Sequence, residues 1–190
     1  MCKDTRIVTG KNIRLLYPAL MKPVSINGSR AKYSTTILIS KTDDFTINGV
    51  KKAIQAAYEA GTDVLRGSSQ SCPPLAAINT PFHDGDIEKQ GKAEYSNCFY
   101  LTATSYSAPG IVDSKLNDIT DDDYDVIYSG AYARVSITFQ AYNFEGKKGI
   151  SCHLNNVQIM GGGTRIKTSF VPKLSAADEF AAFDADEDNP

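Results

Sequence analysis

Residues 128–160 read YSGAYARVSITFQAYNFEGKKGISCHLNNVQIM, and their pattern predicts a β-strand. From Tyr132 to Tyr142 apolar and polar side chains alternate, which is typical of a strand with one buried and one solvated face. The set predicted to be buried is Ala133, Val135, Ile137, Phe139 and Ala141, and the set predicted to be solvated is Tyr132, Arg134, Ser136, Thr138, Gln140 and Tyr142. The solvated set has two tyrosines and an arginine but no carboxylate. Rings that stack on bases and cations that pair with phosphates suit single-stranded nucleic acid, although an ordinary solvated strand gives the same pattern.

The residues that follow this strand predict a hairpin. Residues 144–149, FEGKKG, place two lysines between glycines, as at the tip of a tight turn. A second strand is predicted from Gly149 to Met160, and a run of three glycines then ends it. Lys147 and Lys148 are therefore expected together at the exposed end of the hairpin.

A second stretch has the same kind of solvated face. Within Tyr95–Tyr106 the pattern predicts that Phe99, Leu101 and Ala103 are buried and that Tyr100, Thr102, Thr104 and Tyr106 are solvated. The solvated set again combines tyrosine with threonine and carries no charge. Two strands with such faces favour a binding surface more than either strand alone.

The remaining segments complete the predicted fold. Strands are expected at Thr5–Leu16, where Tyr17-Pro18 ends the strand because proline has no ladder donor, and at Ala31–Lys41. Apolar residues at intervals of three and four predict a helix over Thr46–Ala60, with Gly61 as its stop. Loops are expected at residues 21–30 and 67–92, and an acidic connection at residues 113–125. Short strands separated by turn signals, with one helix, predict a mainly β fold, a small β-barrel rather than a parallel α/β sheet.

Charge divides the chain into two parts. All 20 lysines and arginines lie within residues 1–173, whose net charge is +4, whereas the last 17 residues carry −6. Residues 1–173 are therefore predicted to be one folded domain and residues 174–190 a disordered acidic tail. A mildly basic body with an acidic tail is typical of nucleic-acid-binding proteins, although a solubilising tail on an unrelated enzyme has the same composition.

Several classes of protein are disfavoured by the composition. The sequence has neither an apolar run of membrane-spanning length nor the apolar core of a signal peptide, so a cytoplasmic location and no membrane partner are expected. The four cysteines, Cys2, Cys72, Cys98 and Cys152, have no paired spacing and are predicted to be free thiols. No metal site and no cofactor are expected.

Catalytic motifs are also missing from the sequence. There is no nucleophile elbow, phosphate-binding loop, paired-histidine zinc motif or dinucleotide fingerprint. Asp84-Gly85-Asp86 is interpreted as a turn rather than as a cation site. A metal-dependent nuclease that uses Asp121–Asp123 stays an alternative, and a protein-binding β-barrel, such as a virion or scaffold component, stays another. The prediction is that the protein is not an enzyme.

An ordered set of short motifs resembles a known family. The set comprises Lys32-Tyr33-Ser34, Asp84-Gly85-Asp86, Glu94-Tyr95, Tyr128-Ser129-Gly130, Ala141-Tyr142, Gly146-Lys147-Lys148-Gly149-Ile150 and Leu154-Asn155-Asn156-Val157-Gln158. In this order they resemble the single-stranded-DNA-binding proteins of tailed phages. The resemblance implies an OB-fold barrel with an inserted helix, binding of single strands without base preference, and a role in phage DNA replication or recombination in the host cytoplasm. Tails in that family often end on an aromatic residue, whereas this chain ends in Asp188-Asn189-Pro190.

The candidate DNA-binding residues follow from the two solvated faces and the basic segments. Those predicted to stack on bases are Tyr33, Tyr100, Tyr106, Tyr132 and Tyr142. Tyr33 is the weaker candidate, because alternation places it on the same strand face as the apolar Ile37 and Ile39. Those predicted to contact phosphates are Lys32, Lys41, Arg134, Lys147, Lys148 and Arg165. The partner expected from them is single-stranded DNA. Weaker binding to duplex DNA and a homodimer are left open.

The acidic tail is predicted to compete with DNA for the basic surface, because it is a tethered anion at high effective concentration. The resemblance adds replication and recombination proteins as partners of the tail. Its candidate residues are Asp178, Glu179, Phe180, Phe183, Asp184, Asp186, Glu187 and Asp188.

Overall fold

The computed structural model describes residues 4–25, 28–120 and 125–166. Within these ranges no helix is long and apolar enough to cross a lipid bilayer. The acidic tail, residues 174–190, lies outside the described residues, and so do Asp121–Asp123. The predictions made for those two segments therefore stay predictions.

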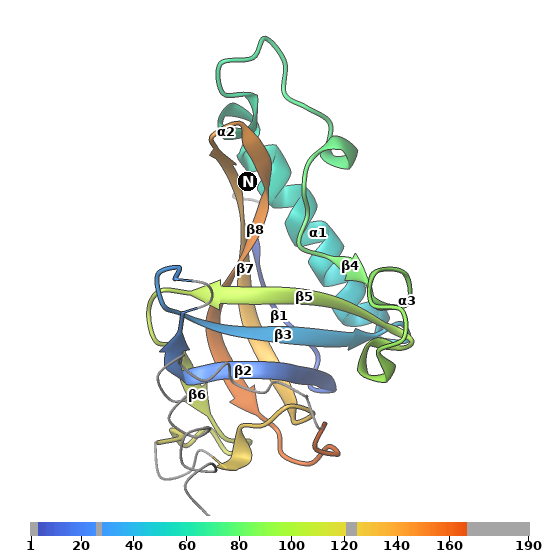
Figure 1. Cartoon of the computed structure of the whole chain (residues 1–190), viewed down its shortest axis with the longest axis vertical. Helices are drawn as coiled ribbons and strands as arrows, with labels where there is room; N and C mark the ends of the chain where they lie inside the picture. The colour runs from blue at the N-terminus through green and yellow to red at the C-terminus, as the bar shows by residue number, and fades with distance from the viewer. Residues whose placement is uncertain (1–3, 26–27, 121–124, 167–190) are drawn as a thin grey trace, which may run out of the picture.

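The centre of the fold is a closed ring of strands (Figure 1). Its members, in the order of their pairing, are β2 (Ile13–Val24), β3 (Lys32–Ser40), β5 (Cys98–Ser105), β8 (Lys147–Ile159) and β7 (Tyr132–Phe144). Only β5 and β8 run parallel, and β7 closes the ring by pairing with β2. This is the arrangement of an OB-fold barrel, so the predicted fold class is confirmed.

Shorter elements extend the ring at its edges. Strand β1 (Arg6–Val8) pairs with β7, β4 (His83–Asp84) pairs with β5, and β6 (Gly110–Val112) runs parallel to β8. The connection from β3 to β5 carries the helices. These are α1 (Asp44–Ala60), α2 (Thr62–Arg66), α3 (Gly85–Glu88) and the single 3₁₀ turns η1 (Leu75–Ala77) and η2 (Ala93–Tyr95).

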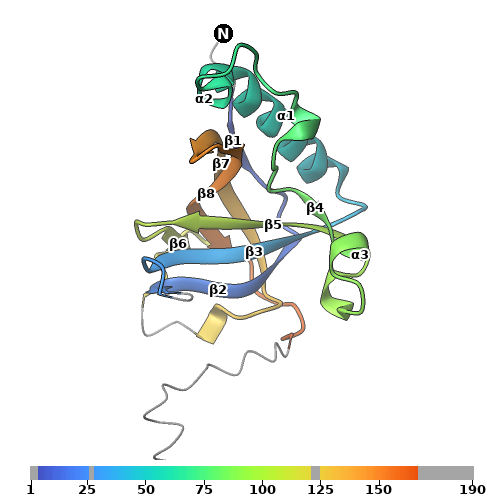
Figure 2. The same ribbon diagram turned by 45° about the horizontal axis from the view of Figure 1, so that its top comes forward.

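Helix α1 is capped by hydrogen bonds at both ends. The Asp43 side chain accepts a hydrogen bond from the backbone N–H of Thr46, which satisfies an otherwise unpaired donor of the first turn. The Gly61 N–H donates to the carbonyls of Ala57 and Tyr58 at the other end. The predicted helix is thus confirmed. It lies alongside the long β7–β8 hairpin, as Figure 2 shows from a second direction.

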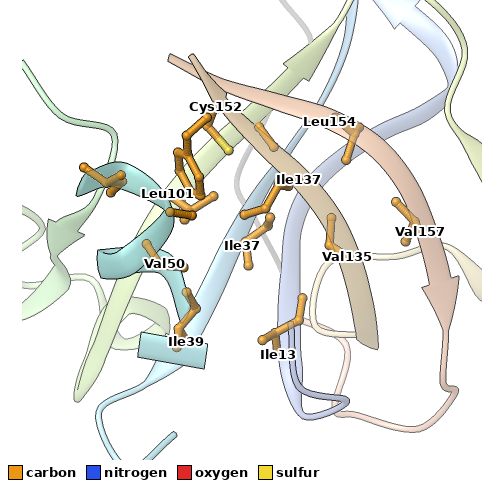
Figure 3. Close-up of a cluster of buried hydrophobic side chains, with 14 of the residues drawn as sticks. Ile13, Ile37, Ile39, Val50, Leu101, Val135, Ile137, Cys152, Leu154 and Val157 are labelled. Carbon is orange, nitrogen blue, oxygen red and sulfur yellow. The ribbon is translucent and has the colours of Figure 1, made fainter. Parts of the chain in front are cut away.

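The barrel interior is filled by every second side chain of its strands. All five side chains of β7 predicted to be buried, from Ala133 to Ala141, are at most 9% exposed. Val135 and Ile137 from β7, Ile37 from β3 and Val50 from α1 belong to one core cluster, which Figure 3 shows. Each large aliphatic side chain buried in this way stabilises the fold by roughly 1.5–3 kcal/mol.

The β7–β8 hairpin has the turn that its sequence predicts. Only Glu145 and Gly146 connect the two strands, and both have positive φ, 49° and 81°. Such a two-residue turn matches the twist of the strands it joins, and glycine suits the second position because it adopts positive φ without strain. The pairing is in register as far as Ser136, where an extra residue enters on the β8 side. The alternation predicted for β7 is interrupted at Ser136, which was predicted to be solvated but is 7% exposed, because Arg6 of β1 packs over it and donates a hydrogen bond to its hydroxyl.

Strand β2 corrects two predictions. The predicted strand Thr5–Leu16 is divided into β1 and β2, and β2 does not end at Tyr17-Pro18 but continues to Val24. Its register with β3 shifts between Leu16 and Ala19, and Tyr17 has a φ of 49°. A bulge at this point accommodates a proline that cannot donate to the ladder, so the proline does not terminate the strand.

Candidate nucleic-acid interface

The outer face of β2, β3 and β5 divides into two halves of different chemistry. We call the first the open half; it consists of Lys32, Ser34, Thr36, Thr102, Thr104 and Tyr106. We call the second the covered half; it consists of Leu16, Leu38, Tyr95 and Tyr100. Both halves point away from the barrel core, because neighbouring side chains along a strand alternate between faces.

The covered half is buried although it lies outside the barrel. Its four side chains form an apolar cluster, each at most 8% exposed, against which Ile166 also packs. Tyr95 comes from η2, and its ring meets the Tyr100 ring edge-on at 5.1 Å. Burial raises the pKa of Tyr95 to about 12. This part of the face offers no free aromatic surface.

Tyr100 is therefore a correction to the sequence analysis, which placed it on a solvated face. It is 8% exposed, the His83 ring stacks on it at 5.2 Å, and its hydroxyl donates to Glu88 Oε2 at 3.1 Å. Burial, and after it the hydrogen bond to Glu88, raises the pKa of Tyr100. Burial works against ionisation of Glu88 as well, but hydrogen bonds from His83 and Tyr100 outweigh it and lower the Glu88 pKa.

Lys41 is also engaged within the protein. Its Nζ lies 2.8 Å from an oxygen of Asp84 and 2.8 Å from an oxygen of Asp86. The hydrogen bonds to these two carboxylates raise the pKa of Lys41, and the bond from Lys41 lowers the pKa of Asp86. The intervening Gly85 has no room for a side chain, because a Cβ there would lie 2.4 Å from the Tyr95 carbonyl oxygen. Among the described residues no cluster of potential metal ligands is present.

The open half is polar and ends in an exposed ring. Ser34 is paired with Thr104 and Thr36 with Thr102, and the two hydroxyls of the second pair lie 3.1 Å apart. Tyr106 follows directly after β5 and is 62% exposed. The Arg30 guanidinium lies over its ring, 4.6 Å from the centroid. Hydroxyls, one exposed ring, Lys32 and the neighbouring Arg30 make this half suited to a strand of nucleotides.

The outer face of β7 adds a second exposed group. Tyr132 is 37% exposed, Arg134 is exposed, and Tyr132 pairs across the sheet with Arg14 of β2. The Arg14 guanidinium donates to the Thr164 carbonyl at 2.9 Å, so it ties down the segment that follows β8. Of these side chains, Tyr132 and Arg134 are free to meet a ligand.

Tyr128 and Arg165 form a closed pair beside this face. The Arg165 guanidinium lies 4.4 Å from the centroid of the Tyr128 ring and donates to the Asp125 carbonyl at 3.5 Å. The Tyr128 hydroxyl donates to the carbonyls of Gly162 and Gly163. Arg165, predicted to contact phosphate, is thus exposed but already hydrogen-bonded.

The remaining predicted residues lie on the β7–β8 hairpin or at the barrel end. The Tyr142 hydroxyl accepts a hydrogen bond from Asn79 at 3.5 Å, and the Lys148 ammonium donates to the Arg66 carbonyl and to Ser69. Lys147 is exposed. The hairpin tip is beside α2, away from the β2–β3 side of the ring (Figure 1). Tyr33 is half-buried opposite Ser105.

Sequence reasoning missed three side chains at the interface. Arg30 was not singled out, although it follows a turn signal and precedes Lys32. Tyr17 was assigned to a strand end, whereas the bulge leaves it 39% exposed. Arg14 was not among the residues predicted for the site.

The barrel topology and the carboxylate-free outer face define an OB-fold protein of the oligonucleotide-binding type. The sequence family described as Enterobacter phage Enc34, ssDNA-binding protein, matches residues 5–190. The chain belongs to this family, whose members are DNA-binding proteins and not enzymes. Comparison with curated protein sequences finds no match.

Solved structures share the fold at low sequence identity. The single-stranded DNA-binding protein of bacteriophage Enc34 with a C-terminal truncation aligns with a TM-score of 0.71 and 19% identity, over 85% of this chain and 88% of that one. The same phage protein in complex with ssDNA gives 0.68 and 22%, over 85% and 89%. The protein gp2.5 of bacteriophage T7, a single-stranded DNA-binding protein, gives 0.58 and 16%, over 90% and 97%.

Proposed function

We propose that this protein binds single-stranded DNA without base preference and protects and organises it during phage DNA replication or recombination in the host cytoplasm. The observation that carries the proposal is the open half, a hydroxyl-lined sheet face that ends in an exposed tyrosine and includes no carboxylate. Membership of the Enc34 family supports it.

The contacts divide into stacking and charge. Tyr106 and Tyr132 are the predicted tyrosines with the most exposed rings, and bases of any identity can stack on them. Lys32 lies at the start of β3, next to Tyr33, which pairs with Ser105, the residue before Tyr106; Arg134 lies two residues from Tyr132. These cations would neutralise neighbouring phosphates. Stacking and charge carry little base information, which accounts for binding without sequence preference.

The other predicted residues take different places in the proposal. Tyr33, Tyr142, Lys147 and Arg165 are secondary contacts, reached by a longer strand. Tyr100, Lys41 and Lys148 already bind protein groups in this structure, so a role for them would require those bonds to open. We therefore assign them to stability rather than to DNA contact.

The acidic tail is proposed to compete with DNA for this surface and to recruit replication or recombination proteins. The net charge of the tail, −6 against +4 for residues 1–173, supports this proposal. Deleting residues 175–190 should tighten DNA binding, most at low salt, because surface charges are screened less there. The same cations could also bind the phosphates of duplex DNA, with lower affinity. The proposal does not specify whether the protein is a monomer or a homodimer.

Fluorescence anisotropy with a labelled single-stranded oligonucleotide tests the function. If Lys32, Arg134, Lys147 and Arg165 each neutralise a phosphate, log K should fall with log salt at a slope of about −3. The titration is carried out both with and without Mg²⁺. Absence of binding, or binding that does not change with salt, would contradict the proposal, and Mg²⁺-dependent cleavage would favour a nuclease instead.

A further inference from the structure

Among the described residues, two guanidinium groups lie over tyrosine rings, and the two pairs differ in the hydrogen bonds that their polar atoms make. In the pair of Arg165 with Tyr128, the hydroxyl and the guanidinium both bind backbone carbonyls. In the pair of Arg30 with Tyr106, the ring contact is the one interaction found for Arg30 within residues 4–25, 28–120 and 125–166. The polar groups of the first pair already bind the protein backbone, and within the described residues those of Arg30 bind nothing.

Arg30 is a cation for which the described residues provide the Tyr106 ring but no carboxylate. It lies in the connection from β2 to β3, two residues before Lys32, and it is exposed. No described carboxylate pairs with it, and its partner ring is 62% exposed. No hydrogen bond from its five N–H donors is found among the described residues, and a cation–π contact uses the flat face of a guanidinium and leaves its edges available to an anion.

We propose that Arg30 is a DNA-contacting residue that acts together with Tyr106. A base stacks on the Tyr106 ring while the guanidinium edge of Arg30 forms paired hydrogen bonds to an adjacent phosphate. In the free protein the same guanidinium holds the ring in place, so less side-chain freedom is lost on binding. This inference rests on the proposed function and adds to it the residue that begins the DNA path.

Arginine is suited to this position in a way that lysine is not. A guanidinium is planar and weakly hydrated, so it can lie on a ring and still offer two parallel donors to phosphate. An ammonium retains the charge but provides neither the flat contact nor the paired geometry. Arg30→Lys should therefore keep the salt dependence of binding and lose part of the affinity.

The test measures affinity for an oligodeoxythymidine over a series of salt concentrations, with the full-length protein. Arg30→Gln should weaken binding and make the slope of log K against log salt shallower by about 0.7. Tyr106→Leu should lower affinity by about 5- to 140-fold with the slope unchanged. In the double variant the combined loss should be smaller than the product of the two single losses, because the two side chains act as one unit.

Two controls separate the outcomes. Lys52→Gln removes an exposed cation on α1, outside the proposed face, and should leave affinity and slope near those of the unsubstituted protein. If the unsubstituted protein itself fails to bind, the proposed function is wrong. If it binds with a steep slope that Arg30→Gln does not change, or if the two losses simply multiply, only the role of Arg30 is overturned.

Discussion

The covered and open halves both lie on the outer side of the barrel, share strands β3 and β5, and differ in what lies over them. Across β3 and β5, Leu38 opposes Tyr100 in the covered half, and Thr36 opposes Thr102 two residues away. Both members of the first pair are buried beneath the segment from β4 to η2, whereas in the second pair Thr36 is buried and Thr102 is exposed. A tyrosine on an outer face is therefore available to DNA only where the rest of the chain leaves it uncovered.

The largest expected effect is on stability and comes from the covered half. Tyr100→Ala should lower the free energy of unfolding by roughly 3–5 kcal/mol, because a buried aromatic ring leaves a cavity and Glu88 loses a donor. Urea denaturation measures this change. Tyr106→Ala, the matched variant in the open half, should change stability by less than about 0.5 kcal/mol. Equal losses in the two variants would remove the distinction between the halves.

The next effect concerns affinity and reverses the order of the two tyrosines. Tyr106→Ala should weaken binding of single-stranded DNA by about 1–3 kcal/mol, because a stacking ring is lost. Tyr100→Phe keeps the buried ring and loses only the hydroxyl, so its affinity should stay close to that of the unsubstituted protein. Anisotropy titrations of both folded variants measure the two affinities. If Tyr100→Phe loses as much affinity as Tyr106→Ala, the covered half also contacts DNA and the distinction between the halves is wrong.

A smaller effect separates the two lysines at the ends of β3. Lys32→Gln should make the salt slope of DNA binding shallower by about 0.7, as expected when one phosphate contact disappears. Lys41→Gln should leave the slope nearly unchanged, because Asp84 and Asp86 already neutralise Lys41. Titrations in a salt series measure both slopes. A larger change for Lys41→Gln would mean that its ion pairs open when DNA binds.

The smallest effect is a dependence of stability on acid pH. The pKa of Asp86 is lowered in the folded protein, chiefly by the hydrogen bond from Lys41. Its contribution is therefore present above the unfolded pKa of about 4 and is lost as the pH falls through the lower folded value. Asp86→Asn should flatten the decline in melting temperature below about pH 4. An identical decline in both proteins would show that the ion pair contributes nothing.

The barrel could be predicted from the sequence because its signals are local. Alternation along residues 132–142 identified the buried set from Ala133 to Ala141, and the turn at Glu145-Gly146 fixed the pairing of the longest strands. The course of β2 past Pro18 was missed, since a bulge and a strand end have the same sequence signal. Of the predicted free thiols, Cys72, Cys98 and Cys152 are confirmed, and Cys2 lies outside the described residues.

The candidate site was less predictable because it depends on contacts between distant segments. The strand face predicted for Tyr100 was correct, since its side chain does lie outside the barrel. The neighbouring sequence gives no sign that His83 and Tyr95 cover it. The partners of Lys41 lie 43 residues further along the chain or more. Period-two patterning gives the face of a side chain, and tertiary packing decides whether that face is free.

Photocrosslinking tests the central claim, that the open half meets DNA and the covered half does not. An oligonucleotide that carries iodouracil would be irradiated with the full-length protein, and the crosslinked peptides would be mapped by mass spectrometry. The account predicts crosslinks at Tyr106 and Tyr132. The Tyr106→Leu variant should give a lower total yield of crosslinked protein. Crosslinks at Tyr95 or Tyr100, with Tyr106 and Tyr132 unmodified, would contradict it.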